Sequence, residues 1–176
     1  MISNGYPMRT EVSKLRKRLE AEGLEHDSTE TEHSRRFLNL EPATAEVIAV
    51  LLRIAGVRNL LEIGTSNGYS TIWLASTIGP RGGRVTSIDR DAGKQAMARE
   101  NLAAVDLLRY VDLVLGDATE IAARLPGPFD CTFFDADRVM RPNSWIYCYP
   151  NCHYPHCFWP IMLCPTRIRS LATSLG

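Results

Sequence analysis

Long apolar runs and a net charge are both missing from this 176-residue sequence. Nowhere do about 18 consecutive apolar residues occur, which excludes an ordinary membrane-spanning helix. The amino-terminal stretch is rich in Lys, Arg and Glu and lacks the apolar core of a signal peptide, so we expect a cytoplasmic protein. Because the formal net charge is zero, bulk electrostatic capture of nucleic acid or of an anionic membrane is not expected.

Acidic residues and lysine are absent from the carboxyl-terminal part of the chain. Residues 138–176 contain no Asp, Glu or Lys, although 20 acidic residues precede them. Prolines recur through the same stretch and are incompatible with a long helix or a central strand. We therefore expect an N-terminal helical cap (1–40), an α/β domain (41–138) and a divergent, poorly ordered tail rich in Cys and Pro (139–176).

The tail has two further interpretations besides disorder. Residue types that bind zinc cluster at Cys148, Cys152, His153, His156 and Cys157. Their spacing matches none of the usual zinc knuckles, and a reducing cytoplasm argues against disulfides. A segment translated out of frame after Arg138 would explain the abrupt change in composition better, and it would carry no selected function.

Two helices are expected before the α/β pattern begins. An apolar stripe on a charged helix recurs at Met8, Val12, Leu15 and Leu19. We expect this helix to end at Gly23 and its stripe to cover the core or a partner subunit in a homodimer. Pro42 suits the first turn of a second helix that ends near Gly56.

Strands and helices then alternate. We expect strands at residues 59–63, 84–89, 111–115 and 129–134, a helix from Asn67 or Tyr69 to Ile78, and a helix at 92–105. Alternation of this kind predicts a doubly wound α/β fold with a mainly parallel sheet. The later strands of such a fold have no candidate, because the apolar run 161–164 is short and lies between prolines. We therefore expect them to be missing or replaced, with strand 129–134 at an edge of the sheet.

Acidic residues lie at the ends of the four expected strands, at Glu62, Asp89, Asp117 and Asp135. Ligands of doubly wound folds bind beyond the carboxyl ends of the strands, so these side chains should meet at one site. Asp89 is placed to accept hydrogen bonds from a ribose diol, and Asp117 could accept from an adenine amino group. Each of them could instead cap the helix that follows.

The glycine turn after the first strand separates the candidate cofactors. Gly64 and Gly68 allow close approach of a ligand to the backbone. Ser66 and Tyr69 occupy the second and third glycine positions of a dinucleotide fingerprint, and there is no Walker lysine. The turn therefore favours a protein that binds a cofactor without a phosphate. A nicotinamide-dependent oxidoreductase is the weaker alternative.

Four segments together resemble the small class I S-adenosylmethionine-dependent O-methyltransferases, the family of catechol and caffeoyl-coenzyme A methyltransferases. They are LLEIGTSNGYSTIWL (60–74), RVTSIDRD (84–91), Gly116-Asp117-Ala118 and FDCTFFDADR (129–138). The resemblance spans residues 35–138 and implies a class I methyltransferase fold with S-adenosyl-L-methionine as the cofactor. It also implies methyl transfer to a hydroxyl of a small phenolic or catechol-like acceptor. Relatives that methylate hydroxylated tRNA uridines make tRNA the other acceptor class.

The resemblance also implies the roles of individual residues. Cofactor contacts are expected from Glu62, Gly64, Thr65, Ser66, Gly68, Ser70, Asp89, Asp117, Ala118 and Asp135. Asp135 additionally falls where the family binds a divalent cation, Mg²⁺, which would lower the pKa of an acceptor hydroxyl. Arg138 replaces the family's lysine base, and a guanidinium can orient an acceptor but cannot act as a base. Because the tail has no second metal carboxylate, a non-catalytic S-adenosylmethionine-binding protein is the main alternative to an impaired enzyme.

Overall fold

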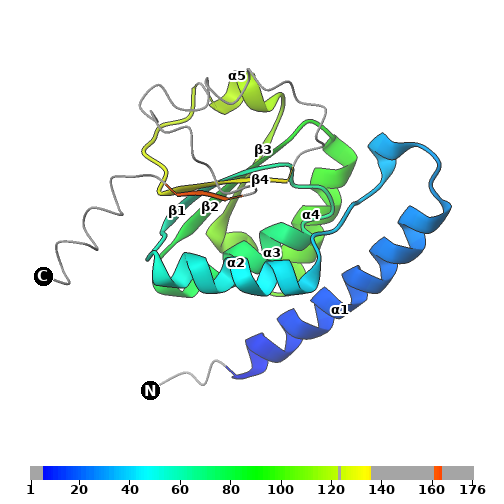
Figure 1. The fold of residues 1–176 in the computed structure, drawn as a ribbon, viewed down its shortest axis with the longest axis horizontal. Coiled ribbons are helices and arrows are strands. Elements are labelled where there is room, and N and C mark those ends of the chain that lie inside the picture. The colour runs from blue at the N-terminus through cyan, green and yellow to red at the C-terminus, as the bar shows by residue number, and fades with distance from the viewer. Residues whose placement is uncertain (1–5, 123, 136–160, 164–176) are drawn as a thin grey trace, which may run out of the picture.

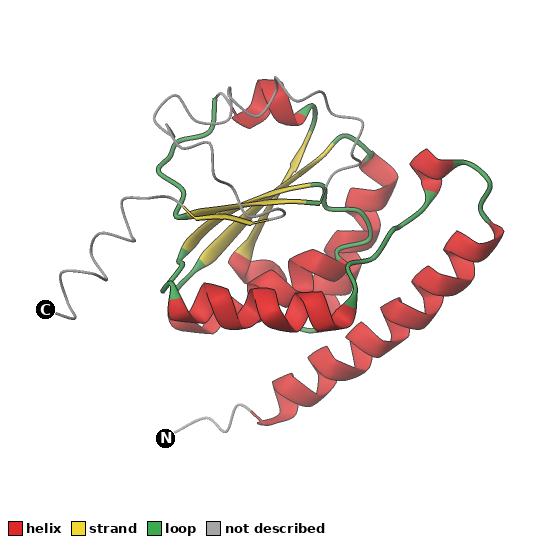
Figure 2. Ribbon diagram, in the orientation of Figure 1, coloured by secondary structure: helices red, strands yellow, loops and turns green. Residues whose placement is uncertain are grey.

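A five-stranded sheet forms the centre of the computed structural model, which describes residues 6–122, 124–135 and 161–163 (Figures 1 and 2). The strands are β1 (Asn59–Ile63), β2 (Arg84–Asp89), β3 (Val111–Leu115), β4 (Cys131–Phe134) and β5 (Ile161–Leu163). Their order is β3-β2-β1-β4-β5, and β1 to β4 are parallel. The expected doubly wound, mainly parallel α/β fold is thereby confirmed. The expected bounds of the first three strands are also confirmed.

Strand β5 corrects the prediction that residues 161–164 form no strand and that β4 is an edge strand. It pairs antiparallel with β4, from Cys131 opposite Leu163 to Phe133 opposite Ile161. An antiparallel strand can join a sheet without a crossover helix, so a three-residue apolar run between two prolines is enough. Both sides of β4 are paired, with β1 on one side and β5 on the other.

Five α-helices surround the sheet in the described part of the chain. They are α1 (Tyr6–Thr29), α2 (Pro42–Ile54), α3 (Tyr69–Ile78), α4 (Ala92–Ala104) and α5 (Ala118–Ala122), with 3-10 turns η1 (His33–Arg35), η2 (Gly79–Arg81) and η3 (Leu108–Tyr110). Helices α2 and α3 lie on one side of the sheet and α5 on the other (Figure 1). Among the described helices, none combines the length and apolarity needed to cross a membrane.

Helix α1 corrects a second prediction, because it continues through Gly23 to Thr29. A Cβ at Gly23 would lie 2.4 Å from Nδ2 of Asn39, whose amide donates to the carbonyl of Leu19 at 2.9 Å. Glycine is therefore needed there for close approach of the chain after α1. Helix α1 tolerates the low helix propensity of glycine, about 1 kcal/mol relative to alanine, because Val12, Leu15 and Leu19 pack the helix on the core.

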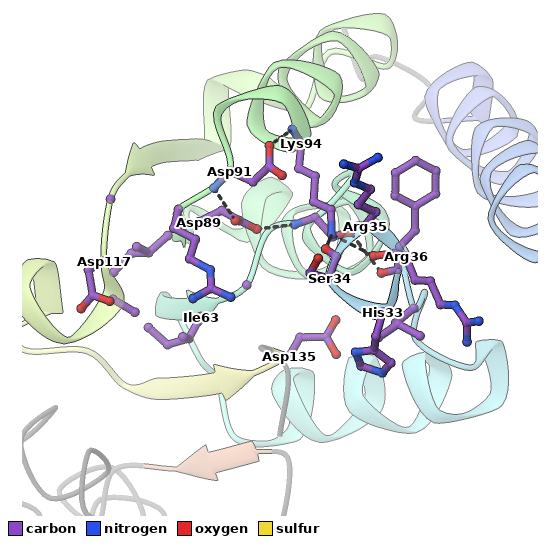
Figure 3. A pocket seen from close by; sticks show the side chains of 18 of the residues that line it. His33, Ser34, Arg35, Arg36, Ile63, Asp89, Asp91, Lys94, Asp117 and Asp135 are labelled. Carbon is purple, nitrogen blue, oxygen red and sulfur yellow. Dashed lines mark hydrogen bonds between the residues drawn. The ribbon is translucent and has the colours of Figure 1, made fainter. Parts of the chain in front are cut away.

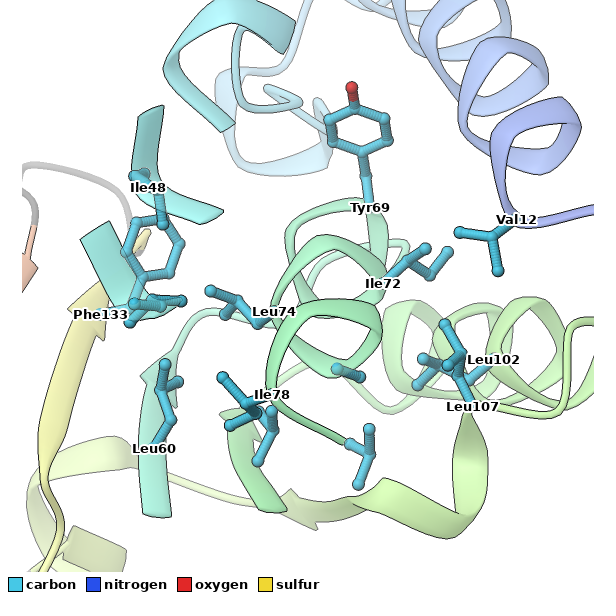
Figure 4. Packing of buried hydrophobic residues seen from close by; sticks show 14 of the residues in the cluster. Val12, Ile48, Leu60, Tyr69, Ile72, Leu74, Ile78, Leu102, Leu107 and Phe133 are labelled. Carbon is cyan, nitrogen blue, oxygen red and sulfur yellow. The ribbon is translucent and has the colours of Figure 1, made fainter. Parts of the chain in front are cut away.

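The main hydrophobic core fills the space between the sheet and helices α1 to α4 (Figure 4). Val12, Leu15 and Leu19 of α1 are buried in it, so their stripe covers the chain's own core. Along β1, Leu60 joins this cluster and Leu61 joins a smaller one beneath α5, as alternation along a strand requires. The N-terminal cap therefore shares its core with the α/β domain, while the expected three-part division and the homodimer remain predictions.

A carboxylate fixes the amino end of β1. Oδ2 of Asp130 accepts hydrogen bonds from the backbone N–H groups of Arg58 and Asn59, at 2.8 and 2.9 Å. The side-chain amide of Asn59 donates to the carbonyl of Pro128 at 2.6 Å. The start of β1 is thus tied to the segment that leads into β4, which keeps these two central strands in register.

Candidate functional site

A pocket of about 650 Å³ opens at the carboxyl ends of the parallel strands (Figure 3). Of the residues expected at the site, six line it: Gly64, Ser66, Asp89, Asp117, Ala118 and Asp135. These residues follow β1, β2, β3 and β4, so the chain brings the ends of four strands to one place. The pocket therefore lies where doubly wound folds bind their ligands.

The turn between β1 and α3 presents its backbone to this pocket. Gly64, Ser66 and Gly68 all have positive φ angles, of 98°, 49° and 86°. A Cβ at Gly68 would lie 2.9 Å from the Cβ of Ala98 in α4, so glycine permits the close packing of α3 on α4. Ser66 holds a conformation that costs a non-glycine residue roughly 1–2 kcal/mol. Contacts around the turn must offset that strain.

Asp89 supplies those contacts. Its Oδ2 accepts hydrogen bonds from the backbone N–H groups of Thr65 and Ser66 at 2.9 and 2.8 Å, and its Oδ1 accepts from that of Asp91 at 2.9 Å. Asp89 does not cap α4, because that helix is capped by Asp91, which accepts from the amides of Gly93 and Lys94. Asp89 thus organises the glycine turn, and its predicted contact with a ribose remains a prediction.

Asp117 caps the helix that follows it, which is the alternative role considered in the sequence analysis. Its Oδ1 accepts from the backbone N–H groups of Thr119 and Glu120, at 2.8 and 3.3 Å, and so caps α5. Its carboxylate also lines the pocket, beside Ala118. Capping accounts for the aspartate at this position, and contacts of Asp117 and Ala118 with an adenine ring remain predictions.

Glu62 lies beneath the turn and is completely buried. Its carboxylate accepts hydrogen bonds from the hydroxyls of Ser70, Thr71 and Ser87, at 2.7, 2.6 and 2.6 Å. Burial raises the pKa of Glu62 to about 7, although these three hydroxyls act in the opposite direction. Such a carboxyl supports the turn from below.

Four of the expected cofactor residues do not line the pocket: Glu62, Thr65, Gly68 and Ser70. The hydroxyl of Thr65 is buried against that of Ser87 at 2.7 Å, and the hydroxyl of Ser70 is bonded to Glu62. These side chains hold the turn in shape. Their assignment as direct cofactor contacts remains a prediction.

Asp135 lies at the end of β4, on the floor of the pocket (Figure 3). Its backbone N–H donates to the carbonyl of Ile63 at 2.9 Å. Desolvation by the surrounding protein raises the pKa of its carboxyl to about 6. Its side chain is exposed to solvent through the open pocket.

The predicted metal site is only partly described. Among residues 6–122, 124–135 and 161–163, no three His, Cys, Asp or Glu side chains are grouped to hold a metal ion. Asp135 alone is one of the about six oxygen ligands that Mg²⁺ requires. Arg138 and the candidate zinc ligands of the tail lie outside the described residues, so their roles remain predictions.

One wall of the pocket was not predicted from the sequence. It is the segment Glu32–Leu38, here called the strap, which contributes seven consecutive residues to the lining. Lys94 donates from Nζ to the carbonyls of Ser34 and Arg36, at 3.0 and 2.8 Å, and Ser66 donates from Oγ to the carbonyl of Phe37 at 3.1 Å. No motif or periodicity marks these residues, because their bonds use backbone carbonyls.

Comparison with known proteins agrees with this geometry. A family model described as O-methyltransferase matches residues 16–152, a wider range than the expected 35–138. A catechol O-methyltransferase of Niastella koreensis is 33% identical over 105 residues, which are 57% of this chain and 47% of that protein. A catechol O-methyltransferase of Mycobacterium tuberculosis is 43% identical over 82 residues, which are 46% of this chain and 37% of that protein.

Solved structures of O-methyltransferases have the same fold. The Bacillus cereus enzyme in complex with SAH is 27% identical with a TM-score of 0.63, over 77% of this chain and 60% of that one. TomG from Streptomyces achromogenes in complex with SAM is 28% identical with a TM-score of 0.61, over 78% of this chain and 58% of that one. The chain spans about half the length of the curated relatives it matches. By its sequence and its fold, the chain belongs to the O-methyltransferase family.

Proposed function

We propose that this chain binds S-adenosyl-L-methionine in the pocket at the strand ends and serves methyl transfer to a hydroxyl oxygen of a small phenolic or catechol-like acceptor. The glycine turn, held by Asp89 at the edge of a pocket of about 650 Å³, is the observation that carries the proposal. The complexes of related O-methyltransferases with SAH and SAM support it.

The charges of the pocket suit this cofactor. Asp89, Asp117 and Asp135 line the pocket, and the sulfonium of S-adenosylmethionine is a cation without a phosphate. Carboxylates a few ångströms from a cation attract it. Arg35, Arg36 and Arg90 also line the pocket, so its charge alone does not separate this cofactor from a pyrophosphate. The turn argues against a nicotinamide dinucleotide, because it lacks the second and third glycines of the fingerprint that admits a pyrophosphate.

Methyl transfer needs little covalent assistance from a protein. The acceptor oxygen attacks the methyl carbon in line, the bond from carbon to sulfur breaks to leave S-adenosylhomocysteine, and the hydroxyl proton passes to solvent. Alignment of the two reactants supplies most of the acceleration. The turn, with the Glu62 carboxyl that supports it from beneath, would fix the sulfonium end of the cofactor. Asp135, on the pocket floor, is the described side chain best placed to orient an acceptor hydroxyl. Since the described residues offer an incomplete magnesium site, no step of the proposal depends on a metal.

Calorimetric titration with S-adenosylhomocysteine and, separately, with NAD tests the cofactor. We expect S-adenosylhomocysteine to bind and NAD not to bind. Binding of NAD without S-adenosylhomocysteine would show that the proposal is wrong.

A transfer assay with isotope-labelled S-adenosylmethionine then tests the reaction, with catechol and hydroxyuridine-containing tRNA as separate acceptors. Methylation of catechol alone is expected. Binding of the cofactor without transfer to either acceptor would favour the non-catalytic alternative, and transfer to tRNA alone would replace the acceptor class.

A further inference from the structure

The strap is held against the pocket from three separate parts of the chain. Asp27, near the end of α1, accepts from the backbone N–H groups of Phe37 and Leu38 at 2.7 and 2.8 Å. Ser66, in the glycine turn, donates to the carbonyl of Phe37. Lys94, in the first turn of α4, donates to two strap carbonyls. Figure 3 shows Lys94 reaching from the α4 side to the strap across the edge of the pocket.

The strap backbone is strained where it meets the glycine turn. Leu38 has a φ of 51°, a left-handed conformation that is costly for leucine. Ser66, which bonds to the neighbouring Phe37, is also left-handed, with a φ of 49°. Strained residues persist where the surrounding contacts determine them, and both of these residues line the pocket. The contacts that hold the strap therefore also hold the shape of the pocket wall.

Lys94 stands at an electrostatically unfavourable place. It is the third residue of α4, where the helix dipole presents partial positive charge. A cation there lowers the stability of the helix unless other groups stabilise its charge. Here two backbone carbonyls accept hydrogen bonds from the ammonium at 3.0 and 2.8 Å. The side chain is half-buried. Helix formation gives no reason for a lysine here, whereas the attachment of the strap does.

We propose that Lys94 is a positioning residue for the cofactor: by binding the carbonyls of Ser34 and Arg36, its ammonium fixes the strap as the outer wall of the pocket. This inference rests on the proposed function, since the ligand held behind the strap is S-adenosylmethionine. The ammonium donates to the strap carbonyls and influences the bound cofactor through the position of the strap. Loss of its bonds frees the strap to move away, so the bound cofactor dissociates faster.

Three variants test this role. Lys94→Met removes the donors and keeps most of the side-chain volume, Lys94→Arg keeps a cation that can donate to two carbonyls, and Lys17→Met is the control. Lys17 is exposed on α1, away from the pocket lining. Affinity and dissociation rate for S-adenosylhomocysteine are measured by calorimetry and by stopped-flow displacement. Hydrogen exchange of the ligand-free proteins reports separately on the strap amides and on those of β1.

We expect Lys94→Met to bind S-adenosylhomocysteine about tenfold more weakly, which is the order of one hydrogen bond from a charged donor. The weaker binding should come from faster dissociation. Exchange should accelerate in the strap and remain unchanged in β1, Lys94→Arg should recover most of the affinity, and Lys17→Met should match the parent chain. Equal affinity of Lys94→Met and the parent would overturn this inference alone. A parent chain that does not bind S-adenosylhomocysteine would overturn the proposed function and the inference together.

Discussion

Replacing Glu62 with glutamine should change how the stability of the folded chain depends on pH. Glu62 is completely buried, and its carboxylate receives three hydroxyl hydrogen bonds. Burial still raises its pKa, from 4.5 to about 7. Glutamine has nearly the same shape and no ionisable proton, so it isolates the contribution of the charge.

The sign and the magnitude follow from proton linkage. Between pH 4.5 and about 7, the folded chain keeps a proton on Glu62 that the unfolded chain has released. The stability contributed by this proton is complete below pH 4.5 and is lost as the pH rises to about 7. A tenfold change in a proton equilibrium is worth about 1.4 kcal/mol, so the full loss is about 3 kcal/mol. Glutamine should avoid this loss.

Urea unfolding of both proteins between pH 5 and 8, followed by circular dichroism, measures the effect. We expect the free energy of unfolding of Glu62→Gln, relative to the parent, to increase with pH. The slope is at most about 1.4 kcal/mol per pH unit, the limit for a difference of one bound proton. The comparison cancels the titrating groups that do not interact with Glu62; Asp135 is not one of them, because its charge helps to raise the pKa of Glu62. A difference that stays constant from pH 5 to 8 would refute the reasoning.

Three further substitutions test other parts of the structure. Asp89→Ala should weaken S-adenosylhomocysteine binding by about 1–3 kcal/mol in calorimetry, because it removes a charged acceptor at the turn; unchanged affinity would remove Asp89 from the site. Gly68→Ala should lower the free energy of unfolding by about 2 kcal/mol in urea, since its Cβ would lie 2.9 Å from that of Ala98 and its φ is 86°; equal midpoints would contradict this. Arg84→Met should cost less than about 1 kcal/mol, because Arg84 and Asp112 are each about half exposed; a larger loss would show that this pair is worth more than its exposure implies.

The sequence predicted the framework of the site because the framework depends on local patterns. The first three strands are short apolar runs bounded by turn residues, and their expected bounds match β1, β2 and β3. The prediction for Gly23 was wrong because helix propensity ignores the tertiary contact with Asn39. The short strand β5 was missed because an antiparallel pairing of three residues leaves almost no pattern in a sequence.

The duties of individual carboxylates were harder to predict. Asp89 ends β2 and Asp117 lies shortly after β3, yet the first holds the glycine turn and the second caps α5. The same local pattern suits both uses, and only the backbone that surrounds each side chain distinguishes them. The strap was missed for a related reason. Lys94 reaches carbonyls 60 and 58 residues away in sequence, and a backbone carbonyl has no residue type that could mark it.

The carboxylates at the two ends of β1 have a further consequence for ligand binding. Asp130 accepts hydrogen bonds from the backbone N–H groups of Arg58 and Asn59, at the start of β1. Asp89 accepts them from Thr65 and Ser66, just after β1. A slip of β1 by one residue would break both sets of contacts at once, and it would exchange the faces of Leu60 and Leu61. The cofactor therefore meets a turn whose position is already set before binding. In the proposed function, little of the binding free energy would be spent on ordering the turn, so this preorganisation would raise the affinity for the cofactor.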